Sequence, residues 1–155
     1  MQFAMKISVG TDHRGLEQKR MVSQIAEELG HSIVDHGANS TESCDYPDIA
    51  NVLGHSIAGG QTDCGILICG TGIGMSIAAN KVKGIRAAVC TDTDQARLSR
   101  QHNDANVLCI RGDSFEESAV REMVTAWLEA EFEGGRHARR IGKVTEMEQE
   151  FGNSA

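Results

Sequence analysis

The sequence predicts a three-layer α/β sandwich around a five-stranded parallel sheet. Short apolar runs alternate with amphipathic helical patterns along the chain, which is the pattern of consecutive βαβ units. The run Gly65–Cys69 (GILIC) is apolar on both faces, as in a strand that helices cover from both sides. Right-handed crossovers then place helices on both faces of the sheet, in a Rossmann-like arrangement. The 155 residues fit one domain.

The first half of the chain carries three of the expected strands and two of the helices. Each strand is a short apolar run bounded by polar or glycine residues. The first helix has apolar residues near the 3.6 period, the second has proline in its first turn, and glycine ends both. The strands are Lys6–Gly10, Ser32–Asp35 and Gly65–Cys69, and the helices are Leu16–Leu29 and a segment from Tyr46 to Gly59-Gly60.

The second half continues the alternation. A short helix follows the glycine-rich turn after Cys69, and a longer one has a regular apolar stripe that ends at Leu128. The remaining strands are Ala87–Thr91 and Val107–Arg111, and the remaining helices are Asp94–Gln101, Phe115–Phe132 and Ile141–Phe151. Because Gly134-Gly135 breaks the pattern, we expect a single domain over residues 1–155 in which about 134–155 form a C-terminal extension.

Composition and charge restrict the partners. The formal net charge is -7 and the pI is about 5.3, which argues against nucleic acid and anionic membranes. No apolar run reaches about 18 residues, so no membrane span is predicted, and the start lacks a secretory signal. Five cysteines without a CxxC pair favour free thiols in a cytoplasmic protein. No metal-ligand spacing is present, so no metal is expected.

The residues that follow the strands are candidates for ligand binding, because open α/β folds bind ligands at the carboxyl ends of their strands. The turn Cys69-Gly70-Thr71-Gly72-Ile73-Gly74 follows the most apolar strand and precedes a helix. Its glycines allow backbone N–H groups to face a small anion. The turn follows the third strand and carries no lysine, so neither a dinucleotide fingerprint nor a Walker A loop is indicated.

Cys69 is the main candidate for chemistry. It stands at a strand end beside a helix N-terminus, where a thiolate is favoured that acts as base or nucleophile. The alternative is a buried cysteine that packs as a small hydrophobic residue. We expect only this packing role for Cys64, Cys90 and Cys109, which lie before or inside strands.

Three polar clusters supply further candidates. Asp12-His13-Arg14 joins an acceptor, a titratable donor and a cation, although Asp12 could equally cap the first helix. His102 and Asn103 offer an acid/base and an oxyanion donor, or a solvated helix end. Arg136 and Arg140 share a face if their segment is helical, and then suit a phosphate or form a solvated surface. Gly134-Gly135 would let this segment reach a partner subunit.

Together these motifs resemble the type B ribose-5-phosphate isomerases, a family that includes galactose-6-phosphate isomerase subunits and allose-6-phosphate isomerase. The motifs occur in the family's order and cover nearly the whole chain, and the third and the HND segment are highly specific. They are GTDHRG (Gly10–Gly15), DYPDIA (Asp45–Ala50), GILICGTGIGMSIAANKVKGIRAAVC (Gly65–Cys90), LSRQHNDANVL (Leu98–Leu108) and EGGRHARR (Glu133–Arg140).

The resemblance implies an aldose–ketose isomerase of sugar phosphates, most closely ribose 5-phosphate, that works through a cis-enediolate without metal or cofactor. By matching position, Cys69 is the base between C1 and C2, and Thr71 helps to move the proton between O1 and O2. His102, with Asp12 as its partner, opens the furanose ring. The implied binding residues are Gly70, Gly72, Ile73, Gly74 and Asn103 for the enediolate, and His13, Arg136 and Arg140 for the phosphate. A homodimer or dimer of dimers, with sites at the interface, is also implied.

One position departs from this pattern. Many members carry a phosphate-contacting arginine two residues beyond the position of Arg111, where this chain has Asp113. An acid beside a phosphate is unfavourable, so another tetrose, pentose or hexose phosphate stays open as the substrate. Some members replace the cysteine by a carboxylate elsewhere, and Met75, where that carboxylate is expected, fits the thiol branch. A non-catalytic binding module and a subunit that needs a different partner chain are the alternatives.

Overall fold

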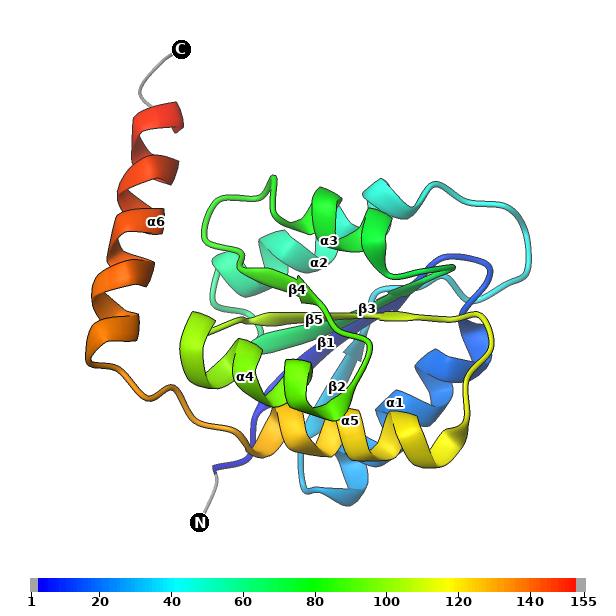
Figure 1. The fold of residues 1–155 in the computed structure, drawn as a ribbon. Coiled ribbons are helices and arrows are strands. Elements are labelled where there is room, and N and C mark those ends of the chain that lie inside the picture. The colour runs from blue at the N-terminus through cyan, green and yellow to red at the C-terminus, as the bar shows by residue number, and fades with distance from the viewer. Residues whose placement is uncertain (1–2, 153–155) are drawn as a thin grey trace.

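A computed structural model describes residues 3–152 and contains a five-stranded sheet with helices on both faces (Figure 1). The predicted fold class is therefore confirmed. The strands are β1 (Lys6–Thr11), β2 (Ser32–Asp35), β3 (Cys64–Cys69), β4 (Ala87–Val89) and β5 (Val107–Arg111). The helices are α1 (Leu16–Glu28), α2 (Tyr46–Ala58), α3 (Ile73–Ala79), α4 (Thr93–Asn103), α5 (Glu117–Glu129) and α6 (Arg136–Gly152).

The sheet is parallel throughout, in the order β2-β1-β3-β5-β4. The order in space differs from the order in the chain because β5 lies between β3 and β4. Parallel pairing places all strand ends at one edge, here called the carboxyl edge, and all strand starts at the opposite amino edge. Each helix between two strands runs back from the carboxyl edge to the amino edge, which fixes where the end of every helix lies.

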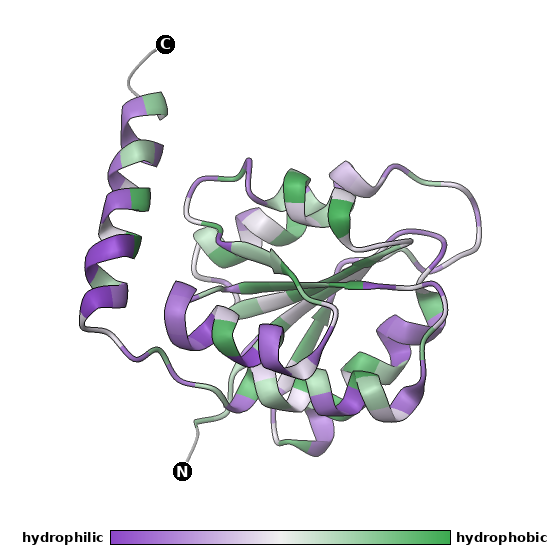
Figure 2. Cartoon of the chain, in the orientation of Figure 1, coloured by the Kyte–Doolittle hydropathy of each residue, from purple (hydrophilic) through white to green (hydrophobic). Residues whose placement is uncertain are grey.

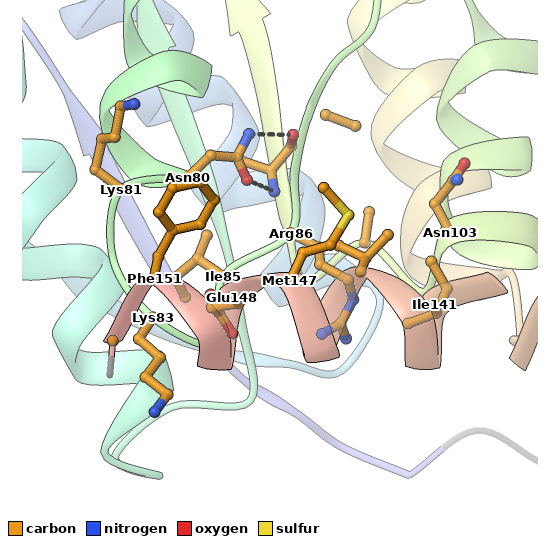
Figure 3. Close-up of a pocket in the computed structure, with 15 residues that line it drawn as sticks. Asn80, Lys81, Lys83, Ile85, Arg86, Asn103, Ile141, Met147, Glu148 and Phe151 are labelled. Atoms are coloured by element: carbon orange, nitrogen blue, oxygen red, sulfur yellow. Dashed lines mark hydrogen bonds between the residues drawn. The ribbon is translucent and has the colours of Figure 1, made fainter. Parts of the chain in front are cut away.

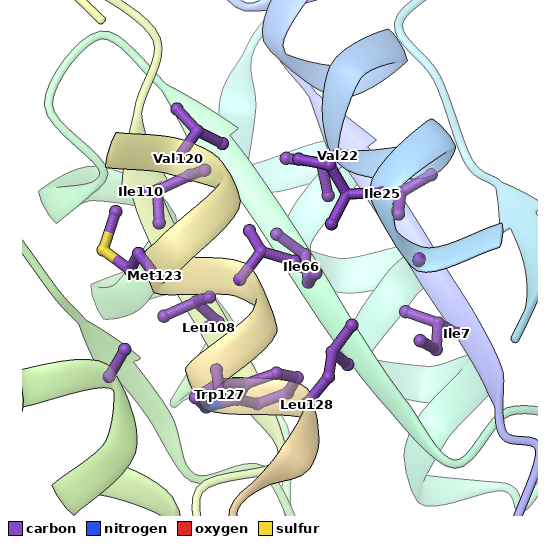
Figure 4. Close-up of a cluster of buried hydrophobic side chains, with 14 of the residues drawn as sticks. Ile7, Val22, Ile25, Ile66, Leu108, Ile110, Val120, Met123, Trp127 and Leu128 are labelled. Carbon is purple, nitrogen blue, oxygen red and sulfur yellow. The ribbon is translucent and has the colours of Figure 1, made fainter. Parts of the chain in front are cut away.

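Two apolar cores lie on the two faces of the sheet. The larger one packs α1, α4 and α5 against the sheet around the fully buried Trp127 (Figure 4). The smaller one packs α2 and α3 against the other face and includes Cys69 and Met75. Cys64 belongs to the first core and Cys69 to the second, so the two thiols face opposite sides of β3, as the five-residue spacing predicts.

The C-terminal segment differs from the sequence prediction. The last helix begins at Arg136 instead of Ile141, and α5 is shorter than the predicted Phe115–Phe132. Gly134 and Gly135 both adopt positive φ, +68° and +56°, so they redirect the chain and the new helix starts directly after them. Figure 1 shows α6 projecting from the body, and Figure 2 shows that polar and apolar residues alternate along it. No helix in residues 3–152 is long and apolar enough to cross a membrane.

Candidate active site in two halves

Cys69 ends β3 at the carboxyl edge of the sheet, beside Arg111 at the end of β5. Its side chain is 4% exposed and packs in the smaller apolar core. Met75 is fully buried in the same core, so the position where relatives could place a carboxylate holds an apolar side chain here. All five cysteines are free, as the sequence predicts.

The other buried thiols lack an arrangement for proton transfer. Burial raises the pKa of Cys64 to about 12 and also raises the pKa of Cys90. Cys109 lies on β5 and packs in the smaller core, and burial is the main cause that raises the pKa of its thiol well above the usual value. These three side chains pack as small hydrophobic residues, which agrees with the sequence prediction for them.

The segment Gly70–Gly74, here called the glycine turn, follows Cys69 directly. Gly72 has φ +82°, and a side chain there would meet the backbone of Ile110 at 3.0–3.2 Å, so only glycine fits. The exposed Thr71 hydroxyl accepts a hydrogen bond from the backbone N–H of Ile73 at 3.2 Å. Helix α3 has only seven residues, so the N–H groups of the turn matter more for an anion than a helix dipole does.

The turn after β1 reaches the same edge. Asp12 is buried, and its Oδ1 accepts a hydrogen bond from the backbone N–H of Arg14 at 2.9 Å. The N-cap of α1 is Gly15, which has no side-chain cap, so the interpretation of Asp12 as a helix cap is wrong. His13 Nδ1 accepts a hydrogen bond from the Cys44 N–H at 3.3 Å. The neutral ring therefore carries its proton on Nε2, which is left as a donor toward a ligand.

His102 and Asn103 lie at the opposite, amino edge. Helix α4 starts after the end of β4, where Asp92 accepts from the Gln95 N–H at 2.8 Å, and it ends at Asn103, just before β5 begins. The five residues of β5 separate the two edges by roughly 13 Å. Within one chain, the structure therefore brings His102 and Asn103 to neither Cys69 nor Asp12.

The His102 ring has neighbours from the C-terminal segment. It stacks on the His137 ring with 4.1 Å between the centroids and 9° between the planes. The Glu133 carboxylate lies 3.8 Å from His102 Nε2 and 3.5 Å from His137 Nε2. Burial lowers the pKa of His137, and the positive charges of Arg136 and Arg140 contribute to this shift.

Arg136 and Arg140 extend from the first turns of α6, at the same amino edge. Both are exposed, and neither forms an ion pair with another residue of the 3–152 stretch. Their i,i+4 spacing on a helix is as the sequence predicts, and it leaves two guanidinium groups available for an anion.

One group in the described part of the chain could hold a metal ion. His102, Glu133 and His137 each offer a ligand atom, and these atoms lie within 4.8 Å of one another. Two imidazoles and a carboxylate are ligands that zinc accepts. Sequence spacing does not indicate this group, because α4 and the α6 segment are distant in the chain.

The sequence analysis gave no specific role to some side chains at these edges. Tyr46 begins α2, and its ring packs on Gly74, where an added side chain would lie 2.8–3.1 Å from the ring. Arg14 lies over Gly70 and pairs with Asp113. Glu133 and His137 flank His102. The motifs DYPDIA, GTDHRG and EGGRHARR contain all of these except Asp113. Arg14 was named only as the cation of a cluster and Asp113 only as a departure from the family's pattern, so their contact was not predicted.

Comparisons with known proteins agree over most of the chain. A family model described as Ribose/Galactose Isomerase matches residues 7–144. Ribose-5-phosphate isomerase B of Escherichia coli is 46% identical over 144 residues, covering 93% of this chain and 97% of that protein. D-erythrulose-4-phosphate isomerase of Pectobacterium atrosepticum is 40% identical over 141 residues, covering 90% and 93%. The solved structure of Clostridium thermocellum ribose-5-phosphate isomerase B has a TM-score of 0.92 at 47% identity, covering 95% and 99%.

Proposed function

The chain belongs to the ribose/galactose isomerase family, and from this premise we propose that it interconverts ribose 5-phosphate and ribulose 5-phosphate. As a member of this family it is an aldose–ketose isomerase. The proposed position of the active site rests on one observation, namely that the glycine turn directly follows the buried Cys69. This arrangement supplies a base and a set of N–H donors for an oxyanion at one point.

The proton-transfer step uses the carboxyl edge. The Cys69 thiolate removes the proton from C2 of the open-chain aldose, and the electrons form a C1=C2 enediolate. The N–H groups of the glycine turn stabilise the negative oxygen, and the exposed Thr71 hydroxyl moves a proton between O2 and O1. Return of the proton from Cys69 to C1 gives the ketose.

The ring-opening step needs the amino edge of a second chain. As the furanose ring opens, His102 transfers a proton between the C1 hydroxyl and the ring oxygen. Asn103 donates a hydrogen bond to the enediolate. Because these residues lie at the far edge of their own sheet, we assign them to the site formed with Cys69 of a partner copy. The partner's Arg136 and Arg140 then hold the phosphate together with His13, and the partner's His102 lies beside Asp12.

Exposed apolar side chains support such a homodimer. Large apolar residues on α2 and α3 are more than half exposed, namely Val52, Ile73 and Ile77. On α6, Met147 is 58% and Phe151 81% exposed. Exposed apolar surface of this kind marks contact sites between proteins. A two-fold dimer repeats each contact, so both composite sites form together.

A groove of about 820 Å³ lies between α6 and the body, at the amino edge (Figure 3). It is lined by Ile85 and Ala87 from the body and by Ile141, Val144 and Met147 from α6. Val144, Met147 and Phe151 of α6 line this groove and are at least half exposed, so apolar surface is open there for a partner copy. The five free thiols suit a reducing cytoplasm as the place where this dimer works.

A four-carbon sugar phosphate is the second candidate substrate. Asp113 stands where the family resemblance implies a phosphate-contacting arginine, and one relative is named D-erythrulose-4-phosphate isomerase at 40% identity. The chemistry at Cys69 is unchanged, because only the distance between the reacting carbons and the phosphate differs.

Proton NMR in D₂O tests the proposal directly. The purified chain is incubated with ribose 5-phosphate, and we expect ribulose 5-phosphate with deuterium entering at the transferred position from solvent. Erythrose 4-phosphate and a hexose 6-phosphate are run in parallel to rank the substrates. If none of these sugar phosphates is turned over or exchanged, the proposed function is wrong.

A further inference from the structure

The Arg14 guanidinium lies directly over the glycine turn. A methyl group built on Gly70 would be 2.9 Å from Arg14 Nη1 and 3.4 Å from Asp113 Oδ2. Arg14 Nη2 donates to Asp113 Oδ2 in an ion pair. The cation and its acid therefore sit above the residue that follows Cys69, at the mouth of the site.

Three strand ends build this position. Arg14 comes from the turn after β1, where its backbone N–H is held by Asp12 Oδ1 at 2.9 Å. Gly70 follows β3, and its carbonyl accepts a hydrogen bond from the Asp113 N–H, after β5, at 3.4 Å. The sheet order places β1 and β5 on the two sides of β3, so side chains from both flanks meet over the glycine turn.

The guanidinium has free hydrogen-bonding capacity. Arg14 Nη2 donates to Asp113, whereas neither Nε nor Nη1 of Arg14 has a hydrogen-bond partner within residues 3–152. A guanidinium carries five N–H donors in a planar fork that matches a phosphate. Asp113 fixes the plane of the fork, which reduces the rotamer freedom lost when a ligand binds.

The anion that fits here is the substrate's phosphate. The reacting carbons must reach the buried Cys69, which is 4% exposed, so the other end of the substrate lies toward the rim. The Arg14 side chain is 55% exposed and stands at that rim. His13, the preceding residue, has its Nε2 donor available on the same turn. Arg14 also offsets the negative charge of Asp113, which would otherwise repel a phosphate dianion.

We propose that Arg14 is a phosphate-binding residue of this isomerase and that Asp113 positions its guanidinium over Gly70. The inference rests on the proposed function, since the phosphate is that of the sugar substrate. It also gives a role to Asp113, the acid that stands where the family resemblance implies an arginine. An exposed ion pair contributes little to stability, so the variants that test it are expected to fold.

The test compares four variants with the wild type: Arg14→Gln, Asp113→Asn, the double variant, and Arg121→Gln as the matched control. Arg121 forms exposed ion pairs with Glu28 at 2.6 Å, between α5 and α1, and with Glu117 at 3.9 Å, and neither partner belongs to the glycine turn. Each protein is assayed for KM and kcat, and the binding of inorganic phosphate is measured by calorimetry. The phosphate measurement needs no turnover.

For Arg14→Gln we expect KM and the phosphate Kd to rise about tenfold to a hundredfold, with kcat changed far less. Asp113→Asn should raise KM less, because the cation remains but is no longer oriented. The double variant should stay close to Arg14→Gln, since removing the acid does not restore the lost donors. Arg121→Gln should match the wild type.

Three results would overturn the inference. If KM and phosphate binding of Arg14→Gln equal those of the wild type, Arg14 does not contact the phosphate. If the double variant regains wild-type KM, Arg14 serves only to neutralise Asp113. Loss of kcat alone would place Arg14 at the enediolate and also contradict the proposal. A wild type that turns over no sugar phosphate contradicts the proposed function instead, and the phosphate binding still decides on Arg14.

Discussion

Mixing two inactive chains should restore activity if each active site combines the opposite edges of two subunits. Cys69→Ala removes the base at the carboxyl edge, and His102→Asn removes the ring-opening group at the amino edge. In a mixed dimer, one site receives both defects and the other receives none. Random assortment makes about half of the dimers mixed, each with one intact site, so about one quarter of the wild-type activity should return.

The need for two chains follows from the separation of the two edges. The five residues of β5 place the strand ends roughly 13 Å apart, and proton transfer requires heavy atoms within about 3 Å. A single chain therefore cannot bring both groups to one substrate. Each variant alone should show at least a roughly hundredfold lower kcat, as for loss of a general acid or base.

The assay uses two differently tagged chains that are expressed together and purified through both tags. Pure mixed dimers should then reach about half of the wild-type kcat per dimer. The matched control pairs Cys69→Ala with Asp12→Asn, because both changes lie at the carboxyl edge and leave a defect in every site. Mixed dimers of Cys69→Ala and His102→Asn that are no more active than either parent would refute the two-chain site.

Three further predictions concern single residues. Cys69→Ala should lower kcat at least about a hundredfold while urea denaturation shows a loss of only about 1 kcal/mol, because one buried sulfur is removed; retained turnover would exclude Cys69 as the base. Gly72→Ala should destabilise the chain by about 1–3 kcal/mol, because φ is +82° and β5 backbone lies within 3.2 Å, and an unchanged urea midpoint would contradict the close approach. Burial lowers the pKa of His31, whose Nδ1 accepts from the Met5 N–H at 3.0 Å. The unfolded chain therefore takes up a proton first as pH falls below about 6.5, and stability drops with it. His31→Gln should flatten this acid loss in thermal unfolding from pH 7.5 to 5.5, and an equal slope in both proteins would remove His31 as a cause.

The sequence was sufficient to predict the helices and strands that local patterns determine. Apolar periodicity and glycine positions predict every strand and helix in the right order. The sequence did not indicate which glycine of GTGIG adopts positive φ, and of the three only Gly72 does. The boundaries of α6 were wrong because Arg136–Arg140 carries no apolar stripe of its own. It is helical because the two left-handed glycines turn the chain and the apolar residues from Ile141 onward face the groove.

Local sequence patterns could not predict how the residues of the site lie relative to one another. That His102 lies away from Cys69 depends on the direction in which α4 runs between β4 and β5, and the motif order alone does not reveal this. The contact of Arg14 with Asp113 depends on β5 lying inside the sheet, next to β3. Ninety-nine positions separate the two residues in the chain, and neither has a sequence signal that names the other.

The insertion of β5 between β3 and β4 also restricts how the chain can have changed over time. It brings positions 14 and 113 into contact, so the effect of a substitution at one position depends on the charge of the residue at the other. Arginine at both positions would set two cations side by side, and acid at both would repel the substrate. A lineage that exchanges the charges therefore passes through a neutral residue at one position, or changes both at once. Descendants should consequently inherit these two positions as a pair.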